Sequence, residues 1–332
     1  MMNKNKIAVI GAGSWGTALT KILLNNIPEV HWWIREVEVI ENLRTYYHNP
    51  LYLSAVEFDK GQLNVHEKIE DAVKNADILF FAVPSAFLED VCSSLPSDFF
   101  KGKKIVSAIK GIIPGANLIV GEYFHRTFNV PFENFAVIGG PSHAEEVALE
   151  KLTYLTIASQ NPQLAIEVSQ LLECRYIRTS QTDDIYGSEY ATVLKNIYAI
   201  AAGIARGLGY GDNYVAVLIS NALSEMRRFI ETISPVKPDL FASIYLGDLM
   251  VTAYSQFSRN RTFGQMLGNG YSVKSAQLEM NMIAEGYYGA KCIHEIIQEK
   301  QLDMPVAEAI YGVLYEKIAP MIEFRILSSK LS

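Results

Sequence analysis

Lys195 is a charged residue inside an apolar stretch, YATVLKNIYAIAAGIARGLG (190–209), whose periodicity predicts a helix. Its neighbours three and four positions away on such a helix are all uncharged: Ala191, Thr192, Tyr198 and Ala199. Burying an uncompensated charge is costly, so this lysine either extends its ammonium group to solvent or serves a chemical purpose. Burial or a second cation lowers the pKa of a lysine towards neutrality, which suits proton donation and acceptance.

Other polar residues have types that could complete such a site. Lys110 lies at the C-terminal end of a predicted strand in SAIKG, the edge where open α/β sheets bind ligands. Asp248 lies between apolar residues in YLGDL and could pair with a buried lysine. The consecutive donors Ser258, Arg259 and Asn260 fit either a phosphate or a polar turn between helices.

A glycine motif lies near the start of the chain. The hexapeptide GAGSWG has the pattern GxGxxG and contributes Gly11, Gly13, Ser14, Trp15 and Gly16. It follows a predicted strand (7–10) and opens a predicted helix, which is the required context. Glycines there permit a tight turn and a close approach of a pyrophosphate, and the helix N-terminus supplies amide donors to the phosphates. The motif predicts a dinucleotide site rather than an ordinary glycine-rich turn.

The choice between NAD and NADP depends on the end of the second predicted strand (30–34). A carboxylate there bonds the adenosine ribose hydroxyls, whereas an arginine accepts a 2′-phosphate. Arg35 and Glu36 offer both groups, and each also fits a solvated surface charge. The sequence therefore leaves the two cofactors open.

The elements that must position these residues fall into two parts. Short apolar runs alternate with helical segments up to about residue 185, which predicts βαβ units and a parallel sheet; the predicted strands are 7–10, 30–34, 77–84, 104–111, 134–141 and 152–159. Beyond that point the periodicity is helical throughout. We expect an α/β Rossmann domain with a doubly wound, mostly parallel sheet over residues 1–185, followed by an all-α domain over 186–332.

Composition excludes several function classes. The net charge of −7 and the pI near 5.5 argue against a nucleic-acid binder and against binding to anionic membranes. The cysteines Cys92, Cys174 and Cys292 are widely spaced, and this odd number without a signal peptide fits a reducing cytoplasm. We find no membrane segment and no ligand spacing for a metal, so no metal is expected.

In combination these motifs resemble one family. The order GAGSWGTAL, FAVPS, AIKG, GGPSHAEE, LKNIYAIAAGI, GDL, SRNR and AEG, from residue 7 to about 310, resembles the bacterial NAD(P)-dependent glycerol-3-phosphate dehydrogenases. The resemblance implies reversible reduction of dihydroxyacetone phosphate to sn-glycerol 3-phosphate, which feeds phospholipid synthesis. It also suggests a homodimer.

The resemblance further implies roles for individual residues. Lys195 is the expected proton donor or acceptor, Lys110 lies near both substrate and nicotinamide, and Asp248 holds Lys195 charged or oriented. The remaining matches are Gly140, Ser142, Ser258, Arg259 and Asn260 for substrate, and Ala144, Arg259 and Glu285 for cofactor.

This chain departs from the family pattern at two places. Ser243–Asp248 replaces a glycine-rich lead into the aspartate, and Asn221 stands where an arginine is expected.

Two other functional interpretations compete with the resemblance. A 3-hydroxyacid dehydrogenase or ketopantoate-type reductase needs a carboxylate clamp instead, and a nucleotide-sensing protein without catalysis should lack Lys195, Lys110 or the anion-binding triplet.

Overall fold

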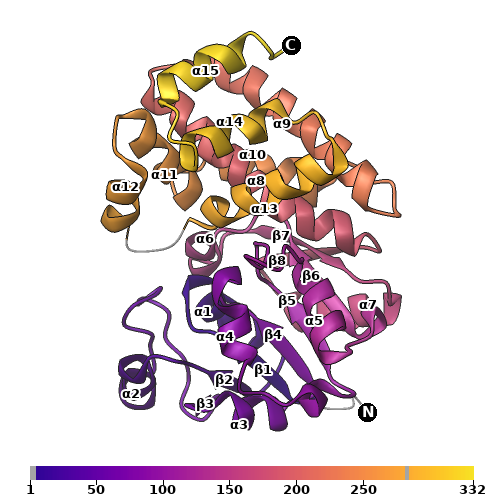
Figure 1. Ribbon diagram of the computed structural model, residues 1–332. Helices are drawn as coiled ribbons and strands as arrows, with labels where there is room; N and C mark the ends of the chain where they lie inside the picture. Colours follow the sequence, from indigo (N-terminus) through magenta and orange to yellow (C-terminus); the bar gives the residue numbers. More distant parts are fainter. Residues whose placement is uncertain (1–4, 281–283) are drawn as a thin grey trace. The chain divides into compact units, whose positions relative to one another are not determined.

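The computed structural model describes residues 5–280 and 284–332, and the chain divides into two compact units (Figure 1). Unit 1 comprises Met1–Ile109 and Val120–Ile185, and unit 2 comprises Lys110–Ile119 and Tyr186–Ser332. The segment that begins with Lys110 therefore belongs with the helical part of the chain. The strand expected to extend to residue 111 ends at Ser107, so Lys110 lies beyond it.

Unit 1 contains one sheet of eight strands in the order β3-β2-β1-β4-β5-β6-β7-β8. In chain order these strands are Ile7–Ile10 (β1), Val30–Trp33 (β2), Leu63–His66 (β3), Ile78–Phe81 (β4), Lys104–Ser107 (β5), Phe135–Gly139 (β6), Thr153–Ala158 (β7) and Ile177–Thr182 (β8). All neighbours pair in parallel except β6 and β7, which pair antiparallel through Val137 and Ala158. The predicted mostly parallel, doubly wound sheet is confirmed.

Helices connect these strands. They are Ser14–Leu23 (α1), Val37–Tyr46 (α2), Ile69–Lys74 (α3), Leu88–Cys92 (α4), Val120–Phe128 (α5), Ala144–Ala148 (α6) and Pro162–Leu172 (α7), with short 3₁₀ turns at Ser85–Phe87, Ser97–Phe100 and Phe132–Asn134. Strands β1 and β4 are buried at every position, as expected for the centre of a sheet covered on both faces. The core of unit 1 includes Val9, Ile22 and Phe80.

The sequence missed two strands, and both are polar edge strands. All four residues of β3 are only half-buried, and β8 carries the polar run Arg178–Thr182 with three exposed positions. Neither has the apolar character that predicts a buried parallel strand, because each pairs with a neighbour on one side only.

Unit 2 is built from helices, as the sequence predicted. They are Ile185–Gly207 (α8), Asp212–Ile233 (α9), Asp248–Tyr254 (α10), Arg259–Gly268 (α11), Val273–Glu279 (α12), Glu285–Lys300 (α13), Pro305–Leu314 (α14) and Pro320–Ser328 (α15), with a π-helical turn at Ser243–Gly247 (η4). The core of this unit includes Leu194, Ile197, Phe229 and Ile310. Within residues 5–280 and 284–332, no helix is both long and apolar enough to cross a bilayer.

Candidate active site

Helix α8, which carries Lys195, packs against α11 through small residues. A Cβ atom added to Gly203 would lie 2.0 Å from the backbone oxygen of Arg261, and one added to Gly264 would lie 2.1 Å from that of Ile200. Gly207 and Gly268 meet one turn further along, where an added Cβ would lie 2.5 Å from a backbone oxygen of the opposite helix. This close approach explains why the stretch around Lys195 is rich in glycine and alanine.

A second small-residue contact holds the start of α13 against α8. A Cβ atom added to Gly286 would lie 2.7 Å from the backbone oxygen of Asn196, the residue next to Lys195. The Gly286 amide donates to Oδ1 of Asn260 at 2.9 Å, so Asn260 satisfies one of the unpaired amides of the α13 N-terminus. Glu285, the first residue of α13, is thereby held near the same part of α8.

Lys195 pairs with Asp248 of α10. Its Nζ lies 2.5 Å from Oδ1 of Asp248, and the two side chains are 4% and 1% exposed. Asp248 begins α10 directly after the π-helical turn η4. The Thr252 hydroxyl, one turn further on, donates to the Asp248 backbone oxygen at 2.6 Å and lies 3.5 Å from Oδ1. The compensating carboxylate is therefore supplied by a distant part of the sequence.

Lys110 brings a second positive charge to the same carboxylate. Its Nζ lies 3.8 Å from Oδ2 of Asp248, and its side chain is 21% exposed. Oδ2 is buried and accepts no hydrogen bond from the residues that the structure describes. The carboxylate thus lies between a buried lysine and a partly accessible one, with hydrogen-bonding capacity left on the side of Lys110.

The electrostatics of this cluster suit Lys195 to proton transfer. Burial lowers the pKa of Lys195 to about 7; the Asp248 carboxylate acts against this by raising the pKa, and the Lys110 ammonium group lowers it further. A lysine with this pKa populates both protonation states near neutral pH, which is the condition for an effective general acid or base.

Asn196 fixes the backbone that carries Lys110. Its Nδ2 donates to the Lys110 carbonyl oxygen at 2.9 Å. Ile112 and Ile119 of the same segment lie in the core of unit 2, and Ile113 forms a bridge to Leu118. Lys110 is thus held by unit 2 itself, with Asn196 directly beside Lys195 in the sequence.

Ser258, Arg259 and Asn260 lie at the start of α11. The Ser258 side chain is the N-cap of this helix, accepting from the Arg261 amide at 3.3 Å. Ser258 and Asn260 therefore both have helix-capping roles, which is the polar-turn interpretation of the triplet. Arg259, the first residue of α11, is only half-buried and supplies the charge suited to an anion.

The glycine turn of unit 1 has the geometry of a phosphate cradle. Gly11 has a left-handed φ of +111°, and a Cβ added to Gly16 would lie 2.2 Å from the Gly11 carbonyl oxygen. A Cβ added to Gly13 would meet no heavy atom of the described residues within 4 Å, so the space above Gly13 is open. The first turn of α1 consists of uncharged residues, Ser14, Trp15, Gly16 and Thr17, which leaves its positive dipole end uncompensated by carboxylates.

Two side chains that the sequence analysis did not single out hold this turn in place. The buried Asn49 amide donates to the carbonyl oxygen of Ala12 and to the hydroxyl of Thr17, each at 2.9 Å. The indole of Trp32 in β2 donates to the carbonyl oxygen of Gly11 at 2.9 Å. The Asn49-Pro50 dipeptide was visible only as part of an irregular segment, because its contacts join residues far apart in sequence.

Arg35 and Glu36 follow β2 and pair with each other. Nη2 of Arg35 lies 3.2 Å from Oε1 of Glu36, and the Arg35 guanidinium lies 5.7 Å from the ring centre of Phe87. The Arg35 side chain is 66% exposed. The group suited to a 2′-phosphate and the group suited to the ribose hydroxyls thus both lie directly after β2.

The segment that resembles the family's GPS motif lies between β6 and α6. Gly140 has a left-handed φ of +102°, and a Cβ there would lie 2.9 Å from the backbone oxygen of Tyr154. The Ser142 hydroxyl donates to the Gly140 carbonyl oxygen at 3.0 Å, and Ala144 is the buried first residue of α6. Among the described residues, no group of three or more His, Cys, Asp or Glu is placed to hold a metal ion.

The departures noted in the sequence have local structural consequences. Ser243–Gly247, in place of a glycine-rich lead, forms the π-helical turn that ends just before Asp248. Asn221 donates to the carbonyl oxygen of Val217 at 2.9 Å and to that of Ser332 at 3.0 Å, so it ties the chain end to α9. The Lys195–Asp248 pair forms in the presence of both changes.

Comparisons with known proteins agree with this arrangement. The family model described as the NAD-dependent glycerol-3-phosphate dehydrogenase N-terminus matches residues 6–165, and the model of the C-terminus matches residues 184–324. The glycerol-3-phosphate dehydrogenase [NAD(P)+] of Staphylococcus carnosus is 33% identical over 95% of each chain, and that of Carboxydothermus hydrogenoformans is 35% identical over 96% of this chain and 95% of its own. A crystal structure of glycerol-3-phosphate dehydrogenase from Coxiella burnetii superposes with a TM-score of 0.91 at 30% identity, covering 98% of both chains.

Proposed function

Because the chain belongs to the NAD-dependent glycerol-3-phosphate dehydrogenase family, we propose that it interconverts dihydroxyacetone phosphate and sn-glycerol 3-phosphate with NAD(H) or NADP(H). The product would supply phospholipid synthesis. The observation that carries the proposal is the buried pair of Lys195 and Asp248, 2.5 Å apart, with the pKa of Lys195 lowered to about 7.

The residues of unit 1 fit a dinucleotide. The open space at Gly13, the left-handed Gly11 and the uncharged first turn of α1 suit a pyrophosphate, with Ser14, Trp15 and Gly16 supplying the turn. We assign Arg35 and Ala144 to the same cofactor, together with Lys110, Arg259 and Glu285 of unit 2. When bound, the nicotinamide supplies or accepts the hydride.

The cluster in unit 2 handles the proton. In reduction, Lys195 donates a proton from Nζ to the carbonyl oxygen of the substrate as negative charge develops there; in oxidation, neutral Lys195 accepts the hydroxyl proton. Asp248 holds Nζ in place and keeps the ammonium form accessible despite burial. Lys110 adds a positive charge that stabilises the developing oxyanion.

The substrate phosphate requires a separate anion site. We assign it to Arg259, with Ser258 and Asn260 fixing the start of α11, and to Gly140 and Ser142 of unit 1. Binding the phosphate away from the reacting carbon contributes energy that orients the carbonyl against Lys195.

The test is the loss of NADH and, separately, NADPH absorbance on addition of dihydroxyacetone phosphate. Rapid oxidation is expected with this substrate, and little with unphosphorylated dihydroxyacetone or with ketopantoate. The ratio of rates with the two cofactors resolves the roles of Arg35 and Glu36. Absence of oxidation with either cofactor, or preference for ketopantoate, would overturn the assignment.

Domain roles, location and assembly are also part of this proposal. We assign cofactor binding to residues 1–185 and substrate chemistry to 186–332, with the segment Lys110–Ile119 acting together with the latter.

We further propose that the enzyme is cytoplasmic, because its three cysteines are free. We also propose that it is a homodimer, because the family resemblance suggests a dimer. Light scattering of the purified protein at a single monomer mass would contradict the dimer.

A further inference from the structure

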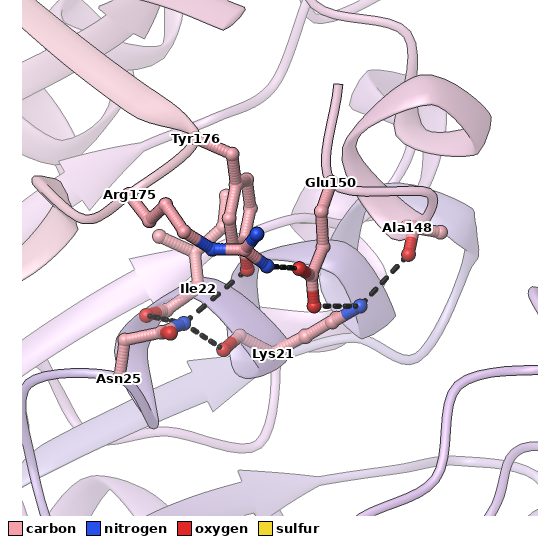
Figure 2. A network of polar contacts seen from close by, with 7 residues as sticks. All are labelled: Lys21, Ile22, Asn25, Ala148, Glu150, Arg175 and Tyr176. Atoms are coloured by element: carbon pink, nitrogen blue, oxygen red, sulfur yellow. Dashed lines mark hydrogen bonds and ion pairs between the residues drawn. The ribbon is translucent and has the colours of Figure 1, made fainter. Parts of the chain in front are cut away.

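A polar network in unit 1 joins the last turn of α1, the helix that follows the glycine motif, to the C-terminal end of α6 (Figure 2). It consists of the seven residues labelled in the figure, and Lys21 in the last turn of α1 lies at its centre. Its ammonium group reaches the last residue of α6, Ala148, whose carbonyl oxygen accepts from Nζ at 2.8 Å. The same Nζ lies 3.1 Å from Oε1 of Glu150.

The backbone of Glu150 turns this side chain towards α1. Glu150 has a left-handed φ of +57°, which is uncommon for a residue with a side chain, and its amide donates to the carbonyl oxygen of Val147 at 2.9 Å. The other carboxylate oxygen, Oε2, pairs with Arg175, so the carboxylate is held from both sides. A hydrogen bond from Lys21 lowers the pKa of Glu150, so this carboxylate is ionised at neutral pH.

A second set of hydrogen bonds, donated by Asn25, fixes the C-terminal end of α1. The Asn25 amide donates to the carbonyl oxygens of Lys21 and Ile22 and to the hydroxyl of Tyr176, at 2.9, 3.0 and 3.2 Å. Lys21 therefore extends from a fixed helix end. Its positive charge lies at the C-termini of both α1 and α6, where the helix dipoles favour a cation.

Helix α6 depends on such a contact because it has only five residues, too few to be stable alone. It packs against α1, and Ala144 and Val147 belong to the same core cluster as Ala18 and Leu19 of α1. The first residue of α6 is Ala144, two residues after Ser142. The last residue is the one that Lys21 holds.

We propose that Lys21 is a positioning residue that fixes α6 against α1 and so sets the spacing between the glycine turn and the Gly140–Ala144 segment. It touches neither cofactor nor substrate and acts through Ala148 and Glu150. The inference rests on the proposed function, in which the glycine turn and Ala144 bind the same dinucleotide. Loss of Lys21 releases α6 at its C-terminal end and weakens cofactor binding more than it slows turnover.

The test measures the NADH dissociation constant by quenching of tryptophan fluorescence, together with steady-state kinetics, for wild type, Lys21→Met, Lys21→Arg and Glu150→Gln. Lys104→Met is the matched control, because Lys104 pairs with Glu167 at 2.5 Å and similar exposure but joins β5 to α7. We expect Lys21→Met to weaken NADH binding by about three- to tenfold, the equivalent of one lost hydrogen bond. Its kcat at saturating NADH should stay within about twofold.

Glu150→Gln should show the same trend more weakly, and Lys21→Arg should restore binding. NADH binding equal to wild type in Lys21→Met, or an equal loss in Lys104→Met, would overturn the positioning role. Glu150→Gln, which keeps the hydrogen bond to Ala148, gives the same comparison if Lys21→Met folds poorly. Absence of wild-type turnover with dihydroxyacetone phosphate would instead contradict the proposed function and leave the NADH-binding comparison intact.

Discussion

Oδ1 of Asp248 lies 2.5 Å from Nζ of Lys195, and both side chains are almost completely buried in unit 2. A buried ion pair contributes little to stability, because desolvation of the two charges offsets their attraction. Its value here is chemical, since burial and the neighbouring Lys110 lower the pKa of Lys195 while Asp248 acts against that shift. Changing either neighbour should therefore move the pKa of Lys195 in a known direction.

Replacing Lys110 should raise the pKa of Lys195, because a nearby positive charge is removed. Reduction needs protonated Lys195, so the wild-type rate should be constant below a pKa near 7 and fall above it. In Lys110→Met the fall should begin at a higher pH, although the absolute rate drops because substrate contacts are lost. The measurement is kcat/KM for dihydroxyacetone phosphate as a function of pH between 5.5 and 9.5. An unshifted profile would contradict the coupling.

Replacing Asp248 should have the opposite effect on the profile. Asp248→Asn removes the carboxylate that raises the pKa of Lys195, so the fall should begin at a lower pH than in wild type. Turnover at pH 7 should drop by about 10²-fold, since less of Lys195 is protonated and its Nζ is less firmly held. Asp248→Glu, which keeps the charge, serves as the control. A shift to higher pH would show that Asp248 does not act on Lys195 in this way.

Gly13 and Gly16 of the motif should respond differently to alanine. At Gly13 an added methyl group has room in the protein but occupies the proposed phosphate space, so Gly13→Ala should keep the melting temperature and weaken NADH binding by at least about tenfold. At Gly16 the methyl group would lie 2.2 Å from a backbone oxygen, so Gly16→Ala should lower stability by about 2 kcal/mol or more. Calorimetry and NADH titration separate the two effects. Normal NADH binding by Gly13→Ala would place the phosphates elsewhere.

Unit 1 should lose stability in mild acid because of a histidine pair. Nδ1 of His31 and Nε2 of His66 lie 2.9 Å apart on β2 and β3. Burial is the main cause that lowers the pKa of each histidine. At His31, the charges of His66 and Lys6 lower the pKa further and Glu29 raises it. At His66, Arg44 lowers the pKa and Asp71 raises it. Since the folded pKa values lie below the unfolded value near 6.5, stability is complete above that pH and falls as the pH drops through it. Thermal unfolding from pH 7.5 to 5 should show this slope, and the double variant His31→Gln with His66→Gln should flatten it.

The sequence predicted local features of the fold well. Strand β1 and the glycine turn follow from a continuous apolar run and three glycines, both of which are visible within one short segment. By contrast, β3 contains Asn64 and His66 and lies at the edge of the sheet, so its pairing with β2 depends on a partner far away in sequence.

For the site, too, the sequence indicated single residues but not the contacts between residues far apart in the chain. Lys195 was conspicuous as a charge in an apolar helix, but its distance from Asp248 and the second cation at Lys110 come only from tertiary packing. Asn196 donates a hydrogen bond to the Lys110 carbonyl oxygen. Nothing in the sequence except its position next to Lys195 indicated this role. The spacing of Gly203 and Gly207 indicated a helix contact only once Gly264 and Gly268 were found opposite them.

The most direct test of the central claim is kcat for reduction of dihydroxyacetone phosphate by Lys195→Met at saturating NADH. Methionine keeps an unbranched side chain of similar length and removes the only group proposed to donate the proton. We predict a loss of about 10²–10⁴-fold with NADH binding unchanged, since Lys195 is not among the residues assigned to the cofactor. A kcat within about threefold of wild type, with the same NADH affinity, would show that Lys195 does not carry the proton.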